Sequence, residues 1–227
     1  MNEENKEQTS SFLKVRTDIK IVILGNSGTG KTSFVNKWIK DTFDENYKAT
    51  VVSEFQYKIF EYKGNYYKVQ LWDLAGQDQN VCMTKVFSKD SHGCIVLTDI
   101  NDETTIDKGV QWKNSVDDNV KFLDGDYIPT VLVQNKVDLV DENEVNKFDD
   151  KIKEICEKHK FINSFKTSAK MGIGIEECMQ FLLGNIIDRM EKCKKDGIDP
   201  FVKDRKSIVL QKSKPQNDNI GGTGGCC

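Results

Sequence analysis

Apolar residues follow two different spacings along the chain, and the two spacings alternate. Short runs in which every position or every second position is apolar are typical of strands. These runs occupy residues 19–24, 51–61, 66–72, 94–99, 130–135 and 161–166. Apolar positions three or four residues apart, which are typical of helices, separate the runs. The expected helices span about 31–40, 105–119, 144–159 and 175–192, with a short irregular one near 79–88.

Two of the expected strands are apolar almost throughout. Residues 94–99 read Cys-Ile-Val-Leu-Thr-Asp, and residues 130–135 read Thr-Val-Leu-Val-Gln-Asn. Such runs indicate central parallel strands that are buried on both faces. Gly64-Asn65 lies between the second and third strands and suits a hairpin turn. The sequence therefore predicts an α/β fold, with a doubly wound, six-stranded, mostly parallel sheet, one antiparallel hairpin strand and helices on both faces.

The two ends of the chain differ from its periodic middle. We expect residues 1–15 to be a flexible extension, residues 16–190 to be one domain and residues 191–227 to be a flexible tail. The tail carries eight Lys and Arg against five Asp and Glu, so it is mildly basic on an acidic body. It ends in a Gly-rich stretch followed by Cys226-Cys227.

Composition argues against several classes of protein. The net charge of −3 argues against nucleic acid as the main partner. No apolar run approaches the roughly 18 residues that indicate a membrane-spanning helix, and the polar N-terminus lacks the apolar stretch of a signal peptide. The seven cysteines show no CxxC spacing, which favours a reduced compartment and argues against a zinc site. His92 and His159 lie far from the motifs and are expected at the surface.

The segment after the first expected strand carries the most specific motif. Residues 25–32 read Gly-Asn-Ser-Gly-Thr-Gly-Lys-Thr, a complete phosphate-binding loop. The glycines let backbone N–H groups point into one concavity. Lys31 would reach the terminal phosphates, and the Thr32 hydroxyl would help to hold Mg²⁺. The following helix places its positive N-terminus against the phosphates. The alternative interpretation is a Gly-rich turn with no ligand.

Three further segments follow strands whose carboxyl ends meet at one edge of the sheet, where ligands bind in such folds. In Asp73-Leu74-Ala75-Gly76-Gln77, the Asp could hold Mg²⁺ through water, and Gly76 could offer its N–H to a phosphate. In Asn135-Lys136-Val137-Asp138, the Asp carboxylate can accept two adjacent N–H donors, which guanine offers and adenine does not. Ser168-Ala169-Lys170 ends the sixth strand. Each segment alone could be a polar turn, but their order indicates a nucleotide site.

With these motifs in this order, the chain resembles a Rab-type small GTPase of the Ras superfamily, over the expected domain and the terminal cysteines. The resemblance implies the small-GTPase P-loop fold, with GTP or GDP and Mg²⁺ as ligands. It implies Gln77 and Lys31 as catalytic residues, and Thr32, Thr50 and Asp73 as the residues that hold Mg²⁺. The nucleotide contacts that it implies are Gly25, Asn26, Ser27, Gly28, Thr29, Gly30, Lys31, Thr32, Ser33, Phe43, Thr50, Gly76, Asn135, Lys136, Asp138, Ser168, Ala169 and Lys170.

The resemblance also implies roles for residues outside the motifs. Phe43 would lie edge-on against the guanine, and Thr50 would close on Mg²⁺ and the γ-phosphate. Phe55, Trp72 and Phe87 match the aromatic triad that Rabs present to effectors. The alternative interpretation is that Phe55 and Trp72 are core residues of their strands.

Cys226 and Cys227 match the cysteines that are both geranylgeranylated in Rabs. The resemblance therefore implies a monomeric switch of vesicle trafficking on the cytoplasmic face of an endosome, phagosome or lysosome-related organelle, with a cytosolic inhibitor-bound pool. The implied partners are an exchange factor, a GAP, a GDP-dissociation inhibitor, an escort protein and effectors. Residues 83–87, 111–113 and 122–129 are most similar to the Rab subgroup of lysosome-related organelles and phagosomes.

The chain departs from the Rab pattern in two places. Val52 stands where Rabs usually have Gly, and Gln79-Asn80 stands where they usually have an Arg and an aromatic residue. Neither position touches the phosphate or guanine contacts. We expect these positions to bear on the choice of exchange factor, GAP and effectors.

Three other functions share parts of the pattern. A small nucleotide kinase or ATPase has the same loop, but it needs an Arg-rich lid and a second substrate site, and Asp138 favours guanine. A module that binds GTP without hydrolysis is disfavoured by Gln77. A Ras- or Rho-type signalling GTPase usually ends in a Cys-aliphatic-aliphatic-X box, whereas this chain ends in Cys-Cys. No motif places an arginine as a cis finger, so hydrolysis is expected to be slow and to depend on a GAP.

Overall fold

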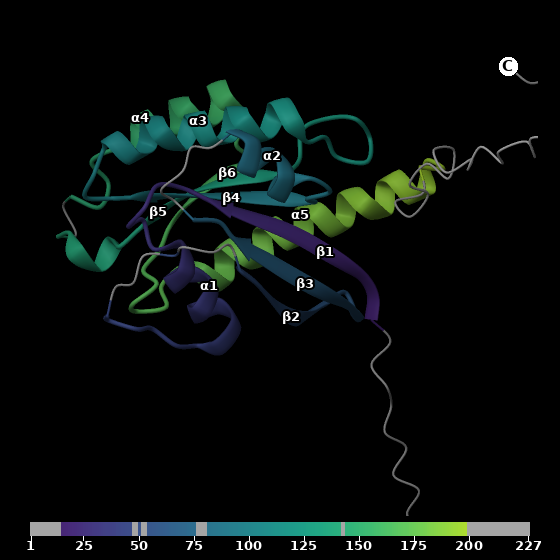
Figure 1. Ribbon diagram of the computed structural model, residues 1–227, viewed down its shortest axis with the longest axis horizontal. Helices are drawn as coiled ribbons and strands as arrows, with labels where there is room; N and C mark the ends of the chain where they lie inside the picture. The colour runs from purple at the N-terminus through teal and green to yellow at the C-terminus, as the bar shows by residue number, and fades with distance from the viewer. Residues whose placement is uncertain (1–14, 47–49, 51–53, 76–80, 142–143, 199–227) are drawn as a thin grey trace, which may run out of the picture.

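A six-stranded sheet between two layers of helices forms the centre of the molecule (Figure 1). The computed structural model describes residues 15–46, 50, 54–75, 81–141 and 144–198. The strands are β1 (Val15–Leu24), β2 (Glu54–Tyr62), β3 (Asn65–Asp73), β4 (Gly93–Asp99), β5 (Thr130–Asn135) and β6 (Asn163–Lys166). Their order is β2-β3-β1-β4-β5-β6, with β2 antiparallel to β3 and every other pair parallel. The predicted fold class is confirmed.

Strands β2 and β3 form the hairpin. Their pairing runs from Glu54 opposite Asp73 to Tyr62 opposite Asn65, so Lys63 and Gly64 make a two-residue turn. Both turn residues have positive φ, 50° and 73°, as a type I′ turn requires. The hairpin turn expected near Gly64-Asn65 is therefore present.

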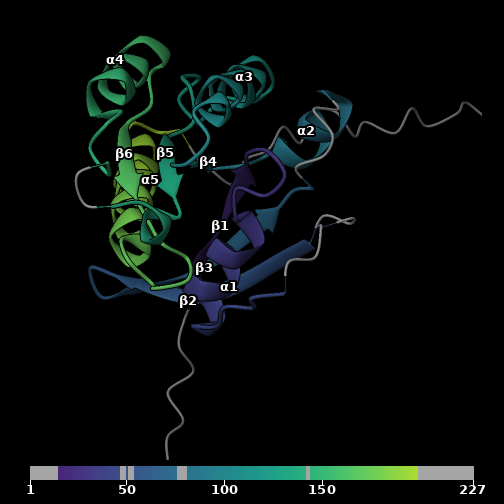
Figure 2. The same cartoon turned by 90° about the vertical axis from the view of Figure 1, so that its left-hand side faces the viewer.

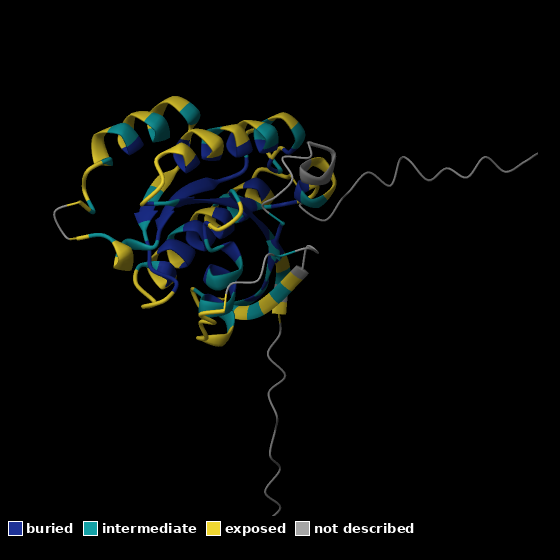
Figure 3. Cartoon of the chain, turned by 60° about the vertical axis from the view of Figure 1, so that its left-hand side comes forward, coloured by how far each residue is buried: buried dark blue, intermediate teal, exposed yellow. Residues whose placement is uncertain are grey.

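The helices cover both faces of the sheet (Figure 2). They are α1 (Lys31–Lys40), α2 (Val81–Ser88), α3 (Thr104–Asn119), α4 (Asp149–His159) and α5 (Ile175–Lys195), with a 3₁₀ turn, η1, at Val137–Leu139. Helices α1 and α5 pack together on one face, whereas α3 packs beside both α2 and α4 on the other. Each helix buries one face and exposes the other, and the central strands are buried, whereas the described side chains of the edge strand β2 are exposed or half-buried (Figure 3).

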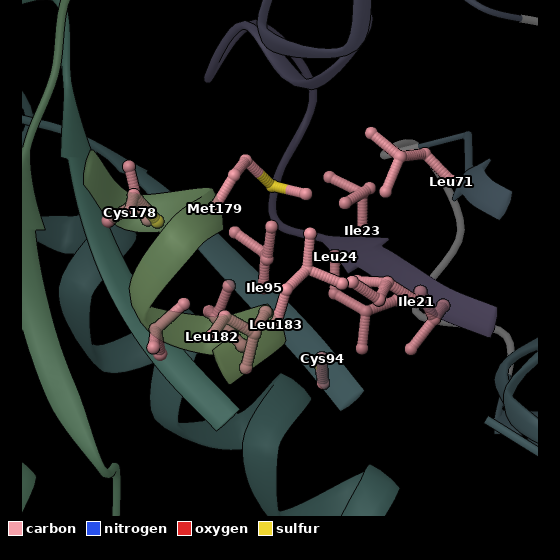
Figure 4. Packing of buried hydrophobic residues seen from close by; sticks show 14 of the residues in the cluster. Ile21, Ile23, Leu24, Leu71, Cys94, Ile95, Cys178, Met179, Leu182 and Leu183 are labelled. Carbon is pink, nitrogen blue, oxygen red and sulfur yellow. The ribbon is translucent and has the colours of Figure 1, made fainter. Parts of the chain in front are cut away.

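The core lies between the central strands and α5 (Figure 4). Ile21 and Ile95 from the sheet and Met179, Leu182 and Leu183 from α5 are fully buried there. Strand β5 is buried along its whole length, as its continuous apolar run predicts. Each buried Leu or Ile contributes about 1.5–3 kcal/mol, so the core fixes the carboxyl ends of β1, β4 and β5 relative to one another.

Helix α4 begins later than its sequence pattern predicts. The expected start was residue 144, but the helix begins at Asp149. The preceding residues form turns, in which the Glu144 amide donates to the Asp141 carbonyl at 2.8 Å. Asp and Asn favour such turns, and the Lys166 Nζ donates to the Asn146 side chain at 2.6 Å. A tertiary contact to β6 therefore holds this segment outside the helix.

Other element boundaries also differ from the expected ones, most clearly in β1, β6 and α5. Strand β1 starts at Val15 rather than 19, because its polar first residues pair with β3. Strand β6 covers only residues 163–166 of the expected 161–166. Helix α5 continues past residue 192 to Lys195, and the lysines in its last turn interact favourably with the helix dipole.

Candidate functional site

The loop between β1 and α1 depends on two glycines that lie against other parts of the chain. Gly25 has φ 142°, and a Cβ there would come within 2.3 Å of the Leu97 carbonyl oxygen on β4. Gly30 has φ 90°, and a Cβ there would come within 2.4 Å of the Asn135 Nδ2 atom on β5. Side chains at either position would force the loop away from the sheet. The loop therefore has the tight, close-lying backbone that its sequence predicts.

Lys31 begins α1 and is only 6% exposed. Its Nζ donates to the carbonyl oxygens of Gly25 at 2.9 Å and Asn26 at 2.8 Å. Burial lowers the pKa of Lys31 to about 8, although the Asp73 carboxylate opposes that shift. Burial destabilises the ammonium form of Lys31, whereas an anion bound in the loop would stabilise it. The arrangement is a buried cation at a helix N-terminus, which favours the binding of phosphate.

Three oxygen-bearing side chains come together beside this lysine. The hydroxyl oxygens of Thr32 and Thr50 lie 2.8 Å apart. The Thr32 hydroxyl also donates to the Asp73 carboxylate at the end of β3. The three residues come from α1, from the segment before β2 and from β3, so only the fold brings them together. Hydroxyl and carboxylate oxygens are ligands that Mg²⁺ prefers, and the donor set therefore fits this ion.

Asn135 connects the phosphate-binding loop to the far end of the site. Its Nδ2 donates to the Thr29 carbonyl oxygen at 2.9 Å. Its Oδ1 accepts hydrogen bonds from the Thr167 hydroxyl at 3.1 Å and from the Ala169 amide at 3.2 Å. Asn135 is 1% exposed. One buried side chain therefore holds the first loop, β5 and the loop after β6 in register.

The remaining polar residues at this end are also paired. The Ser168 hydroxyl donates to the Asp138 carboxylate and orients it. The Lys136 Nζ lies 2.7 Å from the Asp99 carboxylate at the end of β4. Of these residues, Lys136 and Asp138 line the cavity.

A cavity of about 500 Å³ joins the two ends of the site, which is within the range of about 300–1,000 Å³ of ligand pockets. Most of the expected contacts line it: Ser27, Gly28, Gly30, Lys31, Thr32, Ser33, Phe43, Thr50, Asn135, Lys136, Asp138, Ala169 and Lys170. The other expected contacts that the structure describes support this lining rather than form it: Gly25, Asn26, Thr29, Asp73 and Ser168. The sequence motifs therefore converge on one cavity.

Some residues of the site had no signal in the sequence motifs. Asn36, Asp44, Glu45, Asn46 and Leu139 also line the cavity. The Lys170 Nζ lies 3.1 Å from the Glu45 carboxylate, so an exposed ion pair joins two residues of the cavity lining. The sequence did offer one indication that Asp99 belongs to the site. Like Asn135, it is a polar residue at the end of an apolar strand.

The aromatic triad is assembled on one side of the sheet. The rings of Phe55 and Trp72 stack with centroids 5.1 Å apart, and those of Trp72 and Phe87 lie 6.2 Å apart. Phe55 is 53% exposed, so it is not a core residue of its strand. Trp72 and Phe87 are partly buried, and the Lys20 Nζ lies 4.4 Å from the Trp72 ring centroid. The three rings therefore form one contiguous aromatic cluster, of which Phe55 is the exposed member.

Several expected residues lie outside the described residues. These are Gly76, Gln77, Val52, Gln79, Asn80, Cys226 and Cys227. Among the helices that the structure does describe, none has the apolar length that crossing a bilayer requires.

Comparisons with known proteins agree with the nucleotide-binding site that this geometry indicates. Residues 20–188 match the Ras family. Mouse Ras-related protein Rab-32 is 33% identical over 181 residues, which cover 79% of this chain and 80% of that protein. Rab-32A of Dictyostelium discoideum is 34% identical over 170 residues, covering 74% and 77%. Human Rab-7L1 is 29% identical over 169 residues, covering 72% and 80%. The chain therefore belongs to the Ras family, as a Rab-type small GTPase, a class of enzymes that hydrolyse GTP and act in vesicle trafficking.

Proposed function

We propose that this chain binds GTP and GDP with Mg²⁺, hydrolyses GTP slowly and recruits effectors to an endomembrane while GTP is bound. The observation that carries this proposal is the convergence of three groups on one cavity. These groups are the phosphate-binding loop, the cluster of Thr32, Thr50 and Asp73, and the pair of Asn135 and Asp138.

The phosphates occupy the end of the cavity that Lys31 lines. Backbone N–H groups of the loop and the Lys31 ammonium bind them. Thr32, Thr50 and Asp73 hold Mg²⁺, which when bound neutralises charge on the phosphate oxygens. Thr50 has a second role, because its position reports whether the γ-phosphate is present. Its hydroxyl already lies within hydrogen-bonding distance of Thr32.

The base occupies the end of the cavity that Asp138 lines, and Phe43 and Lys170, which also line the cavity, contact it. The Asp138 carboxylate accepts both N–H donors of guanine, and its bond from Ser168 keeps it oriented. Adenine lacks that pair of donors, which disfavours a nucleotide kinase or ATPase. Asn135, Lys136 and Ala169 complete the base end of the site.

Hydrolysis needs a positioned water and neutralised charge rather than a covalent nucleophile. We assign the positioning of water to Gln77 and a γ-phosphate contact to the Gly76 amide, from their place in the family motif. Because the motifs supply no cis arginine, turnover is slow without a GAP. Thr50 would contact Mg²⁺ and the γ-phosphate, and the Gly76 amide the γ-phosphate, only while GTP is bound, so hydrolysis would release the segments that carry these two residues.

The output is a surface that effectors bind only in the GTP state. Phe55, Trp72 and Phe87 supply its aromatic centre. Geranylgeranyl groups on Cys226 and Cys227 anchor the monomer to the membrane. Similarity to Rab-32 and Rab-7L1 supports the cytoplasmic face of an endosome, phagosome or lysosome-related organelle. An exchange factor, a GAP, a GDP-dissociation inhibitor and an escort protein complete the cycle.

Single-turnover hydrolysis of radiolabelled GTP by purified protein tests this proposal. The wild type should convert bound GTP to GDP slowly, and Gln77→Leu should slow conversion further while it retains GTP. Chelation of Mg²⁺ should speed nucleotide release from both proteins. If the Gln77→Leu variant hydrolyses GTP at the wild-type rate, the assignment of Gln77 is wrong. If neither protein retains GTP, the whole proposal is wrong.

A further inference from the structure

The phosphate-binding loop is held at two separate points. At one point, Asn135 donates to the Thr29 carbonyl oxygen at 2.9 Å. At the other, the Trp112 indole Nε1 donates to the Asn26 Oδ1 atom at 3.2 Å. Ser27 and Gly28, which lie between these points, are exposed and line the cavity. The loop is therefore fixed on either side of the tip that faces the ligand.

Trp112 reaches the loop from α3, 86 positions away in sequence. It is 4% exposed, and a buried indole N–H needs an acceptor. Helix α3 is itself held close to β4, because a Cβ on Gly109 would come within 3.2 Å of both Val96 and Thr98. The donor therefore stands on a rigid support rather than on a mobile loop.

Asn26 is the residue through which this contact reaches the phosphate site. Its backbone carbonyl oxygen accepts hydrogen bonds from the Lys31 Nζ at 2.8 Å and from the Thr29 hydroxyl at 2.9 Å. Fixing the Asn26 side chain therefore limits the rotation of a peptide group to which both Lys31 and Thr29 are bound.

We propose that Trp112 is a positioning residue for nucleotide binding, which holds the phosphate-binding loop in its ligand-ready shape through Asn26. This inference rests on the proposed function, because its effect is measured on bound guanine nucleotide. Trp112 does not line the cavity, so its effect on the ligand is indirect, and its hydrogen bond to Asn26 is the contact that links it to the loop. A preorganised loop has less freedom to lose on binding, and the tether slows the release of GDP.

Three variants isolate the contact. Trp112→Phe removes the indole donor, Asn26→Ala removes the acceptor, and the double variant removes both. Trp38→Phe is the matched control, because Trp38 is also 4% exposed and its Nε1 donates to the Glu176 carboxylate at 3.1 Å. Trp38 does not line the cavity. The measurement is the dissociation rate of a fluorescent GDP analogue from each full-length protein, with urea unfolding in parallel.

Loss of one hydrogen bond should speed GDP release by about two- to tenfold in Trp112→Phe. Asn26→Ala should speed it at least as much, and the double variant should release GDP no faster than Asn26→Ala alone. Trp38→Phe should lose stability yet release GDP at the wild-type rate.

Two results would overturn the proposal. One is additive acceleration by the two single changes, and the other is equal acceleration by Trp38→Phe, which would mean that any destabilised core speeds release. If the wild type retains GDP and Trp112→Phe releases it at the same rate, only the tether is wrong. If the wild type binds no guanine nucleotide, the proposed function and the tether both fail.

Discussion

Asn135→Ala is the substitution whose effect the structure defines best. The change removes a side chain that is 1% exposed and makes three hydrogen bonds. Its partners are the Thr29 carbonyl, the Thr167 hydroxyl and the Ala169 amide, which lie on two loops on either side of β5. Alanine makes none of these bonds, so both loops lose their common support.

The size of the effect follows from these bonds. Each contributes about 0.5–1.5 kcal/mol, and a buried group that loses its partner costs about 1–3 kcal/mol. We therefore expect the free energy of unfolding to fall by about 3–4 kcal/mol. A folded domain is stable by only about 5–15 kcal/mol, so the variant should unfold at clearly lower urea concentration.

Urea unfolding with and without GDP separates the two consequences. GDP at a hundred times its Kd stabilises the native state by about 2.7 kcal/mol. If loosening of the loops weakens binding tenfold, the same GDP concentration stabilises the variant by only about 1.4 kcal/mol. Thr98→Val is the matched control, since it removes one buried hydrogen bond to the Val133 carbonyl. It should cost about 1 kcal/mol and leave the stabilisation by GDP unchanged.

The reasoning is refuted if Asn135→Ala is no less stable than Thr98→Val. It is also refuted if GDP stabilises Asn135→Ala as much as it stabilises the wild type, because Asn135 would then hold the fold without holding the site.

Two further predictions concern residues outside the described part of the chain. Replacement of both Cys226 and Cys227 by Ser should move the protein from membranes to the cytosol, because one lipid chain anchors only marginally and two are needed; unchanged recovery in a membrane fraction would contradict double prenylation. Gln79→Arg with Asn80→Phe restores the common Rab pattern and should raise the response to a broad-specificity Rab GAP with little change in GTP affinity, because such regulators depend on a few Arg and aromatic anchors. GAP-stimulated hydrolysis of the two proteins checks this, and a wild-type response as strong as that of an ordinary Rab would contradict it.

Local patterns were sufficient to predict much of the fold. The continuous apolar runs of 94–99 and 130–135 predict buried central strands because a strand covered on both faces has no polar side to show. Strand β5 is fully buried as that reasoning requires. The predicted start of α4 at residue 144 was wrong. The apolar spacing from that residue fits a helix locally, but the hydrogen bond between Lys166 and Asn146 forms only in the assembled fold.

The candidate site divides in the same way. Residues in contiguous motifs, such as Lys31 and Asp138, could be assigned because each motif packs its chemistry into a few neighbouring positions. The contact between Trp112 and Asn26 could not, since a buried tryptophan on a helix fits an ordinary core position equally well. Only the packing of α3 on β4 brings the indole to the loop.

The most direct test of the guanine-nucleotide site is the affinity of the wild type and of Asp138→Asn for GDP, ADP and xanthosine diphosphate. The wild type should bind GDP about a hundredfold or more tighter than ADP, because adenine lacks the pair of N–H donors that the Asp138 carboxylate accepts and leaves that carboxylate without its partners. Asp138→Asn replaces an acceptor oxygen with an NH₂ donor, so it should lose about tenfold or more in GDP affinity and gain relative affinity for xanthosine diphosphate. Equal binding of GDP and ADP by the wild type would contradict the account at its centre.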